Sequence, residues 1–463
     1  MPNTLNYFKE ITKYPRPSKQ EEKIRNFLID FFSGKGYNYK VDTTGNLIVY
    51  IPAKNSQSQE TIILQAHMDM VCVKAEGVNH DFYNDSLEIR EENGFIHTNG
   101  KTTLGADNGI GIALCMSAID FPSHPALELV FTIDEEAGMS GVKGLNFSLL
   151  EGKKIINLDS GDENAICIGS AGGVRISGSK KPEFTTSKKE QYNLEIFGMQ
   201  GGHSGLEINK NRGNAIIIAL DFIANYEKEI EMCNINAGTA ENVIPSKIQI
   251  SLGIDDIHNF EEKLKRYLEN IKTLFDCPSI DFTIQKSENE KNAIRNAQKI
   301  IQSLLQIKDG IYTMSKKIPG LVQTSLNLGV IKIQNGILEL CYLARSNDNE
   351  ELQNLQENII HILGQGNFEI QADTGYPAWQ EDINSELLQI AERNFEKILG
   401  HKVKIVTHHA GLECGFFVKG LNNGANAISI GPNMYNIHSV DEKIQIDSIA
   451  RVEKILTGIL KDL

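Results

Sequence analysis

A histidine and an aspartate two residues apart are the first side chains in the sequence that could act together chemically. His67 and Asp69 end an apolar run, Leu64-Gln65-Ala66, that is typical of a β-strand. Because residues i and i+2 of an extended chain share a face, both side chains are expected to point the same way. An imidazole beside a carboxylate suits a metal ligand whose ring is oriented by a partner. Such a pair also occurs by coincidence, so its meaning depends on whether the chain supplies further ligands.

Further residues of metal-binding type recur at the ends of predicted strands and helices. Asp107 lies at the start of a predicted helix. Glu135 and Glu136 follow one apolar strand, and Asp159 follows another. Helix capping would also explain Asp107, and a solvated loop would explain the paired glutamates. If the acids are buried, a cation must neutralise them or their pKa must rise. Together with His438 they form a set of oxygen and nitrogen donors that Zn²⁺, Mn²⁺ or Co²⁺ accepts.

The order of the predicted elements indicates one α/β domain that is interrupted by a second domain. Strands and helices alternate over residues 1–180, and the same pattern resumes over 379–463. These two stretches are expected to form the catalytic domain, because acids at the carboxyl ends of strands lie where α/β folds place their sites. Residues 185–377 are expected to form an inserted α+β domain, in which a β-β-α-β order occurs twice.

The composition limits the classes of function that are open to the chain. Its 463 residues exceed one ordinary hydrophobic core, which favours two or more domains. A net charge of -14 without a basic stretch argues against a nucleic-acid binder. The sequence does not begin like a signal peptide, no apolar run is long enough to cross a bilayer, and the seven cysteines form no CxxC pair. A cytoplasmic protein without a nucleic-acid or membrane partner is therefore expected.

Seven short motifs, spread over nearly the whole chain, together resemble one known family. They are QAHMDMVC at 65–72, LGADNGIG at 104–111, DEEAG at 134–138, NLDS at 157–160, GGHSG at 201–205, AGLECG at 410–415 and IHS at 437–439. They are similar to motifs of the zinc-dependent dipeptidase, aminoacylase and glutamate carboxypeptidase superfamily, and above all to those of its aminoacyl-histidine dipeptidase branch. The resemblance implies a zinc-exopeptidase-like α/β domain with a mixed sheet, interrupted by an inserted lid domain.

The resemblance also implies a site for two divalent metal ions, Zn²⁺ or alternatively Mn²⁺ or Co²⁺. The ligands that it assigns are His67 and Asp159 for one ion, Glu136 and His438 for the other, and Asp107 as the bridge. Two ions about 3.5–4 Å apart need such a bridging carboxylate, and they acidify a water between them. Asp69 would orient the ring of His67. Glu135 would be the general base that transfers a proton from the water to the leaving amine.

Four further residues match positions at which the family contacts its substrate. They are His203, Asn242, Arg345 and Glu413. His203 would polarise the scissile carbonyl, and Arg345 could hold a C-terminal carboxylate with two parallel hydrogen bonds. Glu413 would lie near the amino end of the substrate. A histidine in an ordinary turn and an arginine on the surface are the alternatives for His203 and Arg345.

The predicted activity is metal-dependent hydrolysis of unblocked dipeptides, including those of the Xaa-His type. A small peptide is then the expected substrate. The usual oligomeric state of the superfamily implies a homodimer formed through the inserted domain. Two other activities on the same metal core stay open, namely those of a tripeptide aminopeptidase and an N-acyl amino-acid deacylase. A non-catalytic scaffold is disfavoured, because the ligand set and Glu135 are both intact.

Overall fold

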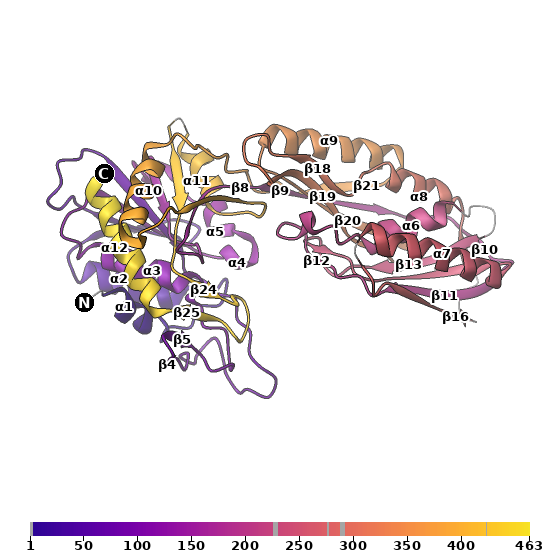
Figure 1. Ribbon diagram of the computed structural model, residues 1–463, viewed down its shortest axis with the longest axis horizontal. Coiled ribbons are helices and arrows are strands. Elements are labelled where there is room, and N and C mark those ends of the chain that lie inside the picture. Colours follow the sequence, from indigo (N-terminus) through magenta and orange to yellow (C-terminus); the bar gives the residue numbers. More distant parts are fainter. Residues whose placement is uncertain (1–2, 226–229, 276, 288–291, 423) are drawn as a thin grey trace. The chain divides into compact units, whose positions relative to one another are not determined.

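The computed structural model describes residues 3–225, 230–275, 277–287, 292–422 and 424–463, and the chain divides into two compact units (Figure 1). Unit 1 comprises Met1–Gly169, Trp379–Thr407 and Leu412–Leu463, and unit 2 comprises Ser170–Ala378 and His408–Gly411. The sequence predicts an inserted domain from residue 185, whereas unit 2 begins earlier. The difference arises because strand β9 (Gly172–Lys180) pairs with two strands of unit 2, β20 (Ile337–Ser346) and β21 (Glu369–Ala372).

The main sheet of unit 1 has eight strands in the order β1-β2-β6-β3-β7-β23-β8-β22. Their bounds are Asn38–Val41, Leu47–Ile51, Ala126–Thr132, Thr61–His67, Lys154–Asn157, Asn426–Ser429, Ala165–Ser170 and Lys404–His408, in that spatial order. Strand β3 pairs in parallel with β6 and β7, and β23 pairs in parallel with β7. The pairs β1–β2 and β2–β6 are antiparallel. The predicted α/β fold with a mixed sheet is therefore confirmed.

Helices cover both faces of this sheet, because alternate residues of its strands point to opposite sides. Ile62 and Leu64 of β3 join one apolar core, whereas Ile63 between them joins another. The helices that contribute to the first core are α1 (Thr4–Ile11), α2 (Glu22–Ser33), α3 (Ala106–Ala118), α10 (Glu386–Leu399) and α12 (Ile446–Asp462). The helices that contribute to the second are α5 (Ser140–Lys143) and α11 (Cys414–Leu421).

A second, small sheet in unit 1 connects the C-terminal segment to the middle of the chain. It has four strands in the order β24-β25-β5-β4. Their bounds are Met434–Tyr435, Lys443–Gln445, Phe95–His97 and Arg90–Glu92. The loop between β24 and β25 contains His438, so the pairing of β25 with β5 places that loop beside the segment that precedes Asp107.

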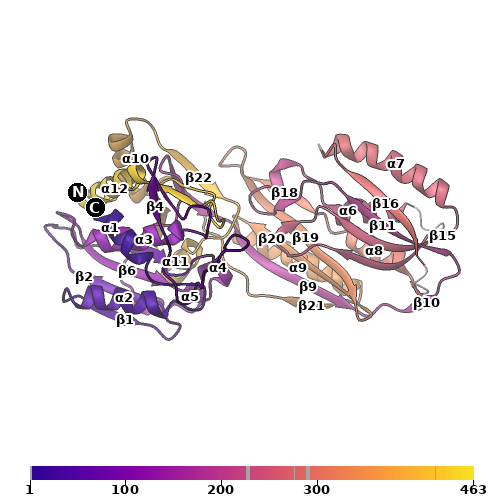
Figure 2. The same cartoon turned by 90° about the horizontal axis from the view of Figure 1, so that it is seen from below.

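The main sheet of unit 2 has nine strands, and its pairs are antiparallel. Besides β9, β20 and β21 they are β11 (Glu190–Phe197), β13 (Ile230–Ala237), β15 (Ile248–Ile254), β16 (Asp281–Ser287), β18 (Gly310–Met314) and β19 (Val322–Gln334). The helices that share its core are α6 (Ala215–Ala224), α7 (Ile257–Leu274), α8 (Ala297–Leu305) and α9 (Asn349–Gln365) (Figure 2). With the two-residue β14 left aside, the order strand-strand-helix-strand occurs as β13-β15-α7-β16 and again as β19-β20-α9-β21. Among the described residues, no helix combines the length and the apolar character that spanning a bilayer requires.

Candidate metal centre

The candidate site of unit 1 lies where three neighbouring strands end. In the parallel register His67 of β3 lies opposite Thr132 of β6, and Gln65 lies opposite Asn157 of β7. The segments that leave β6 and β7 therefore begin beside His67, and they carry Glu135, Glu136 and Asp159. This edge, at the carboxyl ends of parallel strands, is the usual site position in α/β sheets.

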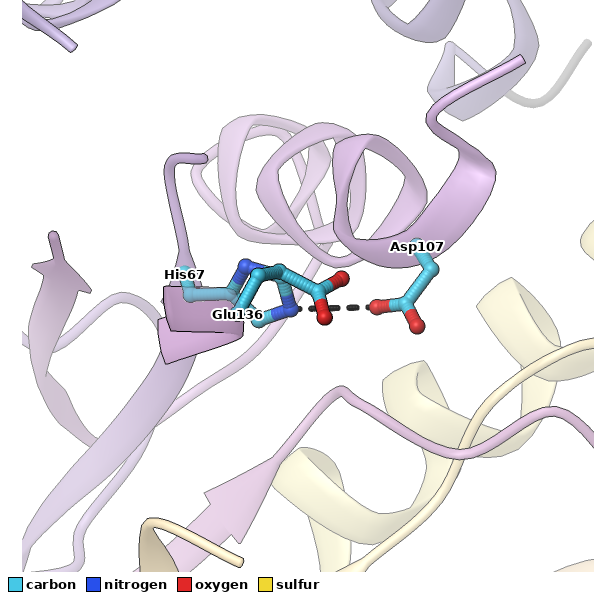
Figure 3. A group of neighbouring side chains, drawn as sticks. All are labelled: His67, Asp107 and Glu136. Atoms are coloured by element: carbon cyan, nitrogen blue, oxygen red, sulfur yellow. Dashed lines mark hydrogen bonds and ion pairs between the residues drawn. The ribbon is translucent and has the colours of Figure 1, made fainter. Parts of the chain in front are cut away.

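Asp107 lies between two histidines that come from distant parts of the chain. Its Oδ1 atom is 3.0 Å from Nε2 of His67, and its Oδ2 atom is 3.3 Å from Nε2 of His438. Nε2 of His67 is also 3.5 Å from Oδ1 of Asp159, and Nε2 of His438 is 3.0 Å from Oε1 of Glu136. Figure 3 shows His67, Asp107 and Glu136 gathered, with the contact between His67 and Asp107 drawn. The donors thus form two groups that share one carboxylate.

The chemistry and spacing of these donors fit a divalent metal ion. Ligand atoms about 2.0–2.1 Å from a tetrahedral ion lie about 3.3 Å from one another, which matches the observed separations of 3.0 to 3.5 Å. One atom each from His67, Asp107 and Glu136 can be chosen so that all lie within 4.8 Å. The side chains of Asp107, Glu136 and Asp159 are only 13%, 8% and 9% exposed, so their charges require compensation.

The charges and hydrogen bonds within the group shift the pKa values of its members. Burial lowers the pKa of His67, but the charge of Asp159 and the hydrogen bond to Asp107 raise it well above its ordinary value. Hydrogen bonds to Asp107 and Glu136 raise the pKa of His438 to about 10. Burial and the charge of Asp107 raise the pKa of Asp159 to about 6. A bound metal ion replaces the protons on these groups, because it needs neutral imidazoles and ionised carboxylates.

Asp69 is fully buried and holds both His67 and the segment that carries the two glutamates. Its Oδ1 atom is 3.3 Å from Nδ1 of His67. The same carboxylate accepts the backbone N–H groups of Glu135 and Glu136 at 3.0 and 3.1 Å, and the hydroxyl of Ser18 at 2.8 Å. Burial would raise the pKa of Asp69, but the bonds to His67 and Ser18 lower it to about 2. Asp69 is therefore a charged acceptor that fixes the His67 ring.

Glu135 lies beside the donor groups without joining them. It begins the short helix α4 (Glu135–Gly138), and no hydrogen bond is recorded for its carboxylate among the described residues. Burial raises the pKa of Glu135 well above its ordinary value, and the charges of Asp159 and Glu413 act in the same direction. A carboxylate with a raised pKa and no fixed partner is suited to accept a proton near neutral pH.

Unit 2 holds two of the predicted substrate contacts near each other. His203 of β12 (Gly202–His203) pairs with Val243 of β14 (Val243–Ile244), next to Asn242, whose side chain is exposed. Nδ1 of His203 accepts two backbone N–H groups, each at 3.2 Å. The neutral ring therefore carries its hydrogen on Nε2, where it can donate. Burial and the charge of Arg345 both lower the pKa of His203, which favours this neutral form.

Arg345 is almost completely buried in unit 2, at 4% exposure. It donates from Nη1 to the hydroxyl of Tyr376 at 2.7 Å. Its Nε atom is buried without a hydrogen-bond partner among the described residues. A buried guanidinium with an unused donor is costly unless an acceptor arrives, which makes Arg345 a candidate anion-binding group. The burial of Arg345 excludes the alternative that it is an ordinary surface arginine.

Glu413 lies in unit 1 with no exposed surface. Its Oε2 atom accepts the hydroxyl of Thr132 at 2.7 Å and the amide of Gln65. Burial raises the pKa of Glu413 to about 8. These contacts place Glu413 among the strands that carry the site.

Two buried charged residues beside the site carry no clear signal in the sequence. Arg16 and Glu442 are 1% and 2% exposed. Arg16 stands in the proline-containing break between the first two helices, where a polar residue is unremarkable. Glu442 follows another acid, Asp441, so the local pattern suggests an exposed turn. Only the contacts in the folded chain reveal their positions.

Comparison with known proteins places this site in a family. The model of peptidase family M20/M25/M40 matches residues 63–462. The cytosol non-specific dipeptidase of Escherichia coli (strain K12) is 30% identical over 472 residues, covering 98% of this chain and 96% of that protein.

Solved structures give the same result. Aminoacylhistidine dipeptidase from Vibrio alginolyticus superposes with a TM-score of 0.90 at 30% identity, covering 100% of this chain and 96% of that one. Aminopeptidase PepT from Bacillus cereus ATCC 10987, at 18% identity and a TM-score of 0.57 over 99% and 98% of the two chains, shares the fold. The resemblance that the motifs indicate is confirmed: the chain belongs to peptidase family M20/M25/M40.

Proposed function

We propose that this protein is a dinuclear metallodipeptidase that hydrolyses unblocked dipeptides, those of the Xaa-His type among them. The observation that carries the proposal is the position of Asp107, whose two oxygens face His67 and His438 separately. The full-length similarity to two dipeptidases supports the substrate class. Membership in a peptidase family supports hydrolysis of an amide bond.

The proposed ligands follow the two groups of donors. His67 and Asp159 would hold one ion, Glu136 and His438 would hold the other, and Asp107 would be shared between them. Zinc fits this donor set, and manganese and cobalt are alternatives. When bound, the two ions supply Lewis acidity that polarises the scissile carbonyl and lowers the pKa of an attacking water.

Glu135 moves the proton in the proposed reaction. Its carboxylate accepts a proton from the water whose oxygen attacks the carbonyl carbon of the substrate. It then donates that proton to the amine as the carbon–nitrogen bond breaks. Asp69 keeps the Nδ1 side of the His67 ring occupied, so that Nε2 faces the donors of the metal site.

Unit 2 supplies groups that suit the ends of a short peptide. Arg345 binds the C-terminal carboxylate through donors that Tyr376 leaves free, and Asn242 adds a polar contact. His203 donates from Nε2 to the carbonyl oxygen of the substrate. Glu413 is proposed to lie near the amino end of the substrate, and its Oε1 atom, buried without a hydrogen-bond partner among the described residues, is an acceptor that could serve there. A cytoplasmic location and a homodimer through the inserted domain belong to the same proposal, and light scattering during gel filtration tests the dimer.

A substrate comparison tests the proposed function. Protein loaded with zinc is assayed in parallel with Ala-His, with a tripeptide and with an N-acetyl amino acid. We expect rapid hydrolysis of Ala-His and slow or no hydrolysis of the others. Preferential cleavage of the tripeptide would indicate an aminopeptidase, and preferential cleavage of the acetyl compound a deacylase. No hydrolysis of any of them by metal-loaded protein would contradict the proposal.

A further inference from the structure

One buried carboxylate holds the backbone of the segment that presents Asp107. Oε2 of Glu442 accepts the N–H groups of Leu104 and Gly105 at 2.8 and 3.0 Å. Oε1 accepts those of Ala106 and Asp107 at 2.8 and 3.4 Å. These are N–H groups that the start of α3 cannot satisfy within the helix. A negative charge at this end also complements the helix dipole.

Arg16 holds the same segment from the other side. Its guanidinium donates to the backbone oxygens of Gly105 and Asp69, the latter at 3.1 Å. The peptide groups on both sides of Gly105 are thus fixed, since Glu442 binds its N–H and Arg16 binds its C=O. The backbone oxygen of Arg16 in turn accepts the N–H of Met70 at 3.1 Å. Arg16 therefore connects the segment of Asp107 to the segment of His67 and Asp69.

The packing around Gly105 leaves no room for adjustment. Gly105 has a φ angle of 63°, in the left-handed region. A Cβ atom added there would lie 2.5 Å from Nη2 of Arg16 and 2.6 Å from the sulfur of Met70. The close approach is consistent with a segment whose position is determined by these two neighbours.

Glu442 also belongs to the loop that carries a second donor. It lies four residues after His438, in the loop between β24 and β25. A displacement of Glu442 would therefore change the position of Asp107 relative to His438. Both carboxylate oxygens of Glu442 and both Nη atoms of Arg16 are engaged by backbone groups, and the Nε atom of Arg16 is buried without a hydrogen-bond partner among the described residues. We therefore assign neither residue a direct contact with a metal ion or a substrate.

We propose that Glu442 and Arg16 are positioning residues that set the metal affinity of the site by fixing Asp107 relative to His67 and His438. The inference rests on the proposed dinuclear function. Its physical basis is preorganisation: ligands held at the correct separation before binding pay no ordering cost when the metal arrives. Loss of a group that orients a ligand typically weakens metal binding about 10- to 100-fold.

The variant Glu442→Gln tests the proposal. The amide keeps the volume of the side chain, but its NH₂ group faces N–H donors, so two of the four bonds are lost. Zinc affinity is measured by competition with a chromophoric chelator, and folding by circular dichroism. We expect affinity about 10- to 100-fold below wild type, with turnover regained when zinc is raised in proportion. Wild-type affinity in the folded variant would overturn the proposal.

Glu128→Gln is the matched control in the same unit. Glu128 is 3% exposed, and it accepts the backbone N–H groups of Glu151 at 2.9 Å and Gly152 at 3.1 Å. Its chemistry and burial resemble those of Glu442, but the loop that it holds carries none of the metal donors. We expect reduced thermal stability and unchanged zinc affinity. An equal loss of affinity in Glu128→Gln would mean that general destabilisation is the cause, and the positioning role would be wrong.

Arg16→Lys provides a second measurement if Glu442→Gln does not fold. Lysine keeps the positive charge but lacks the planar fork that reaches two backbone oxygens at once. We expect weaker zinc binding in the same direction, and wild-type affinity in folded Arg16→Lys would contradict the proposal. Zinc binding by the wild-type protein distinguishes the proposed function from the positioning role. If it fails to bind two zinc ions, the proposed function is wrong; if it binds two and the variants bind as tightly, only the positioning role is wrong.

Discussion

The two units hold their chemically important side chains in different ways. In unit 1 the donors of the candidate metal site contact one another. The carboxylates of Asp69 and Glu442 accept backbone N–H groups of the segments that carry these donors. In unit 2 the Arg345 guanidinium has a buried Nε atom without a partner in the described part of the chain. His203 has its Nδ1 atom occupied, which leaves Nε2 to donate. The buried carboxylates and imidazoles of unit 1 suit a cation. The Arg345 guanidinium and the Nε2 donor of His203 in unit 2 suit an anion or a carbonyl oxygen.

In the proposed function, this difference separates metal binding and proton transfer from recognition of the substrate ends. Changes in unit 1 are expected to affect turnover and metal content, because the groups there are proposed to bind the metal ions and to act on the bond that breaks. A change at Arg345 in unit 2 is expected to affect KM, because Arg345 is proposed to bind the C-terminal carboxylate, which does not react. His203 is the exception in unit 2, because it is proposed to donate to the carbonyl oxygen of the substrate. Each prediction below would weaken or strengthen that distinction.

Metal removal has the largest expected effect. Exhaustive treatment with a chelator should abolish peptide hydrolysis, because the activated water is lost. Addition of Zn²⁺, Mn²⁺ or Co²⁺ should restore it. The measurement is turnover of Ala-His together with metal analysis before and after treatment. Full activity in protein shown to be metal-free would contradict the proposed role of unit 1 in metal-dependent catalysis.

Replacement of the proposed base comes next. Glu135→Ala should lower kcat by about 10²- to 10⁴-fold, the usual contribution of general acid–base catalysis. Metal content should stay near two ions per chain, because Glu135 makes no recorded bond to the donor groups. Steady-state kinetics and metal analysis on the same preparation provide the test. Near-wild-type turnover, or loss of the metal, would show that Glu135 has another role.

Arg345→Lys should raise KM for a dipeptide by about 10- to 100-fold, with a smaller change in kcat. The reason is that lysine cannot make the two parallel bonds that a guanidinium makes to a carboxylate, and hydrogen bonds to charged groups contribute about 1.5–3 kcal/mol. Arg175→Lys is the control, because Arg175 lies in the same sheet with its side chain 51% exposed. A fall in kcat with unchanged KM would place Arg345 in catalysis and blur the distinction between the units.

Asp309 gives the smallest expected effect, and it concerns stability. Its carboxylate accepts the N–H of Leu328 at 2.7 Å and the amide of Asn214 at 3.2 Å. Burial raises its pKa from 3.8 to about 7. The folded state therefore binds more protons than the unfolded state between these values. The contribution is favourable below pH 4 and is lost as the pH rises towards 7.

Asp309→Asn should remove this dependence while keeping both hydrogen bonds to the side-chain oxygen. We expect the variant to gain about 1 to 3 kcal/mol relative to wild type between pH 4 and pH 8. Thermal unfolding of both proteins across that range provides the measurement, and the difference cancels groups that titrate in both. A constant difference would show that the carboxylate is ionised throughout.

The site residues that could be predicted from local sequence are those that follow strands. His67 and Asp159 follow apolar runs, and the parallel register of β3 and β7 brings those runs together. The choice between a cap and a ligand at Asp107 could not be made locally. Asp107 and Asn108 have non-helical backbone angles, and no side-chain cap is recorded for the N-terminal cap residue of α3. The actual cap is Glu442, 335 residues further along the chain, and no local pattern encodes such a contact.

The start of the inserted domain shows the same limit. The polar residues near Lys180 and Lys181 resemble a linker, yet β9 extends to Lys180 and pairs with β20. Pairing between distant strands, and not composition, decides which unit a strand joins. By contrast, the predicted strand-strand-helix-strand order in the insertion rests on local periodicity, and both copies of that order occur in unit 2.

The place of β23 in the main sheet of unit 1 has a consequence for synthesis. This strand, Asn426–Ser429, lies between β7 and β8, which are made more than two hundred residues earlier. A nascent chain that has not reached it has unpaired edges on both earlier strands, and such edges pair readily with other polypeptides. The histidine at 438 is made later still. The strand that joins β7 to β8 and the proposed metal ligand His438 are therefore both made after the rest of this sheet.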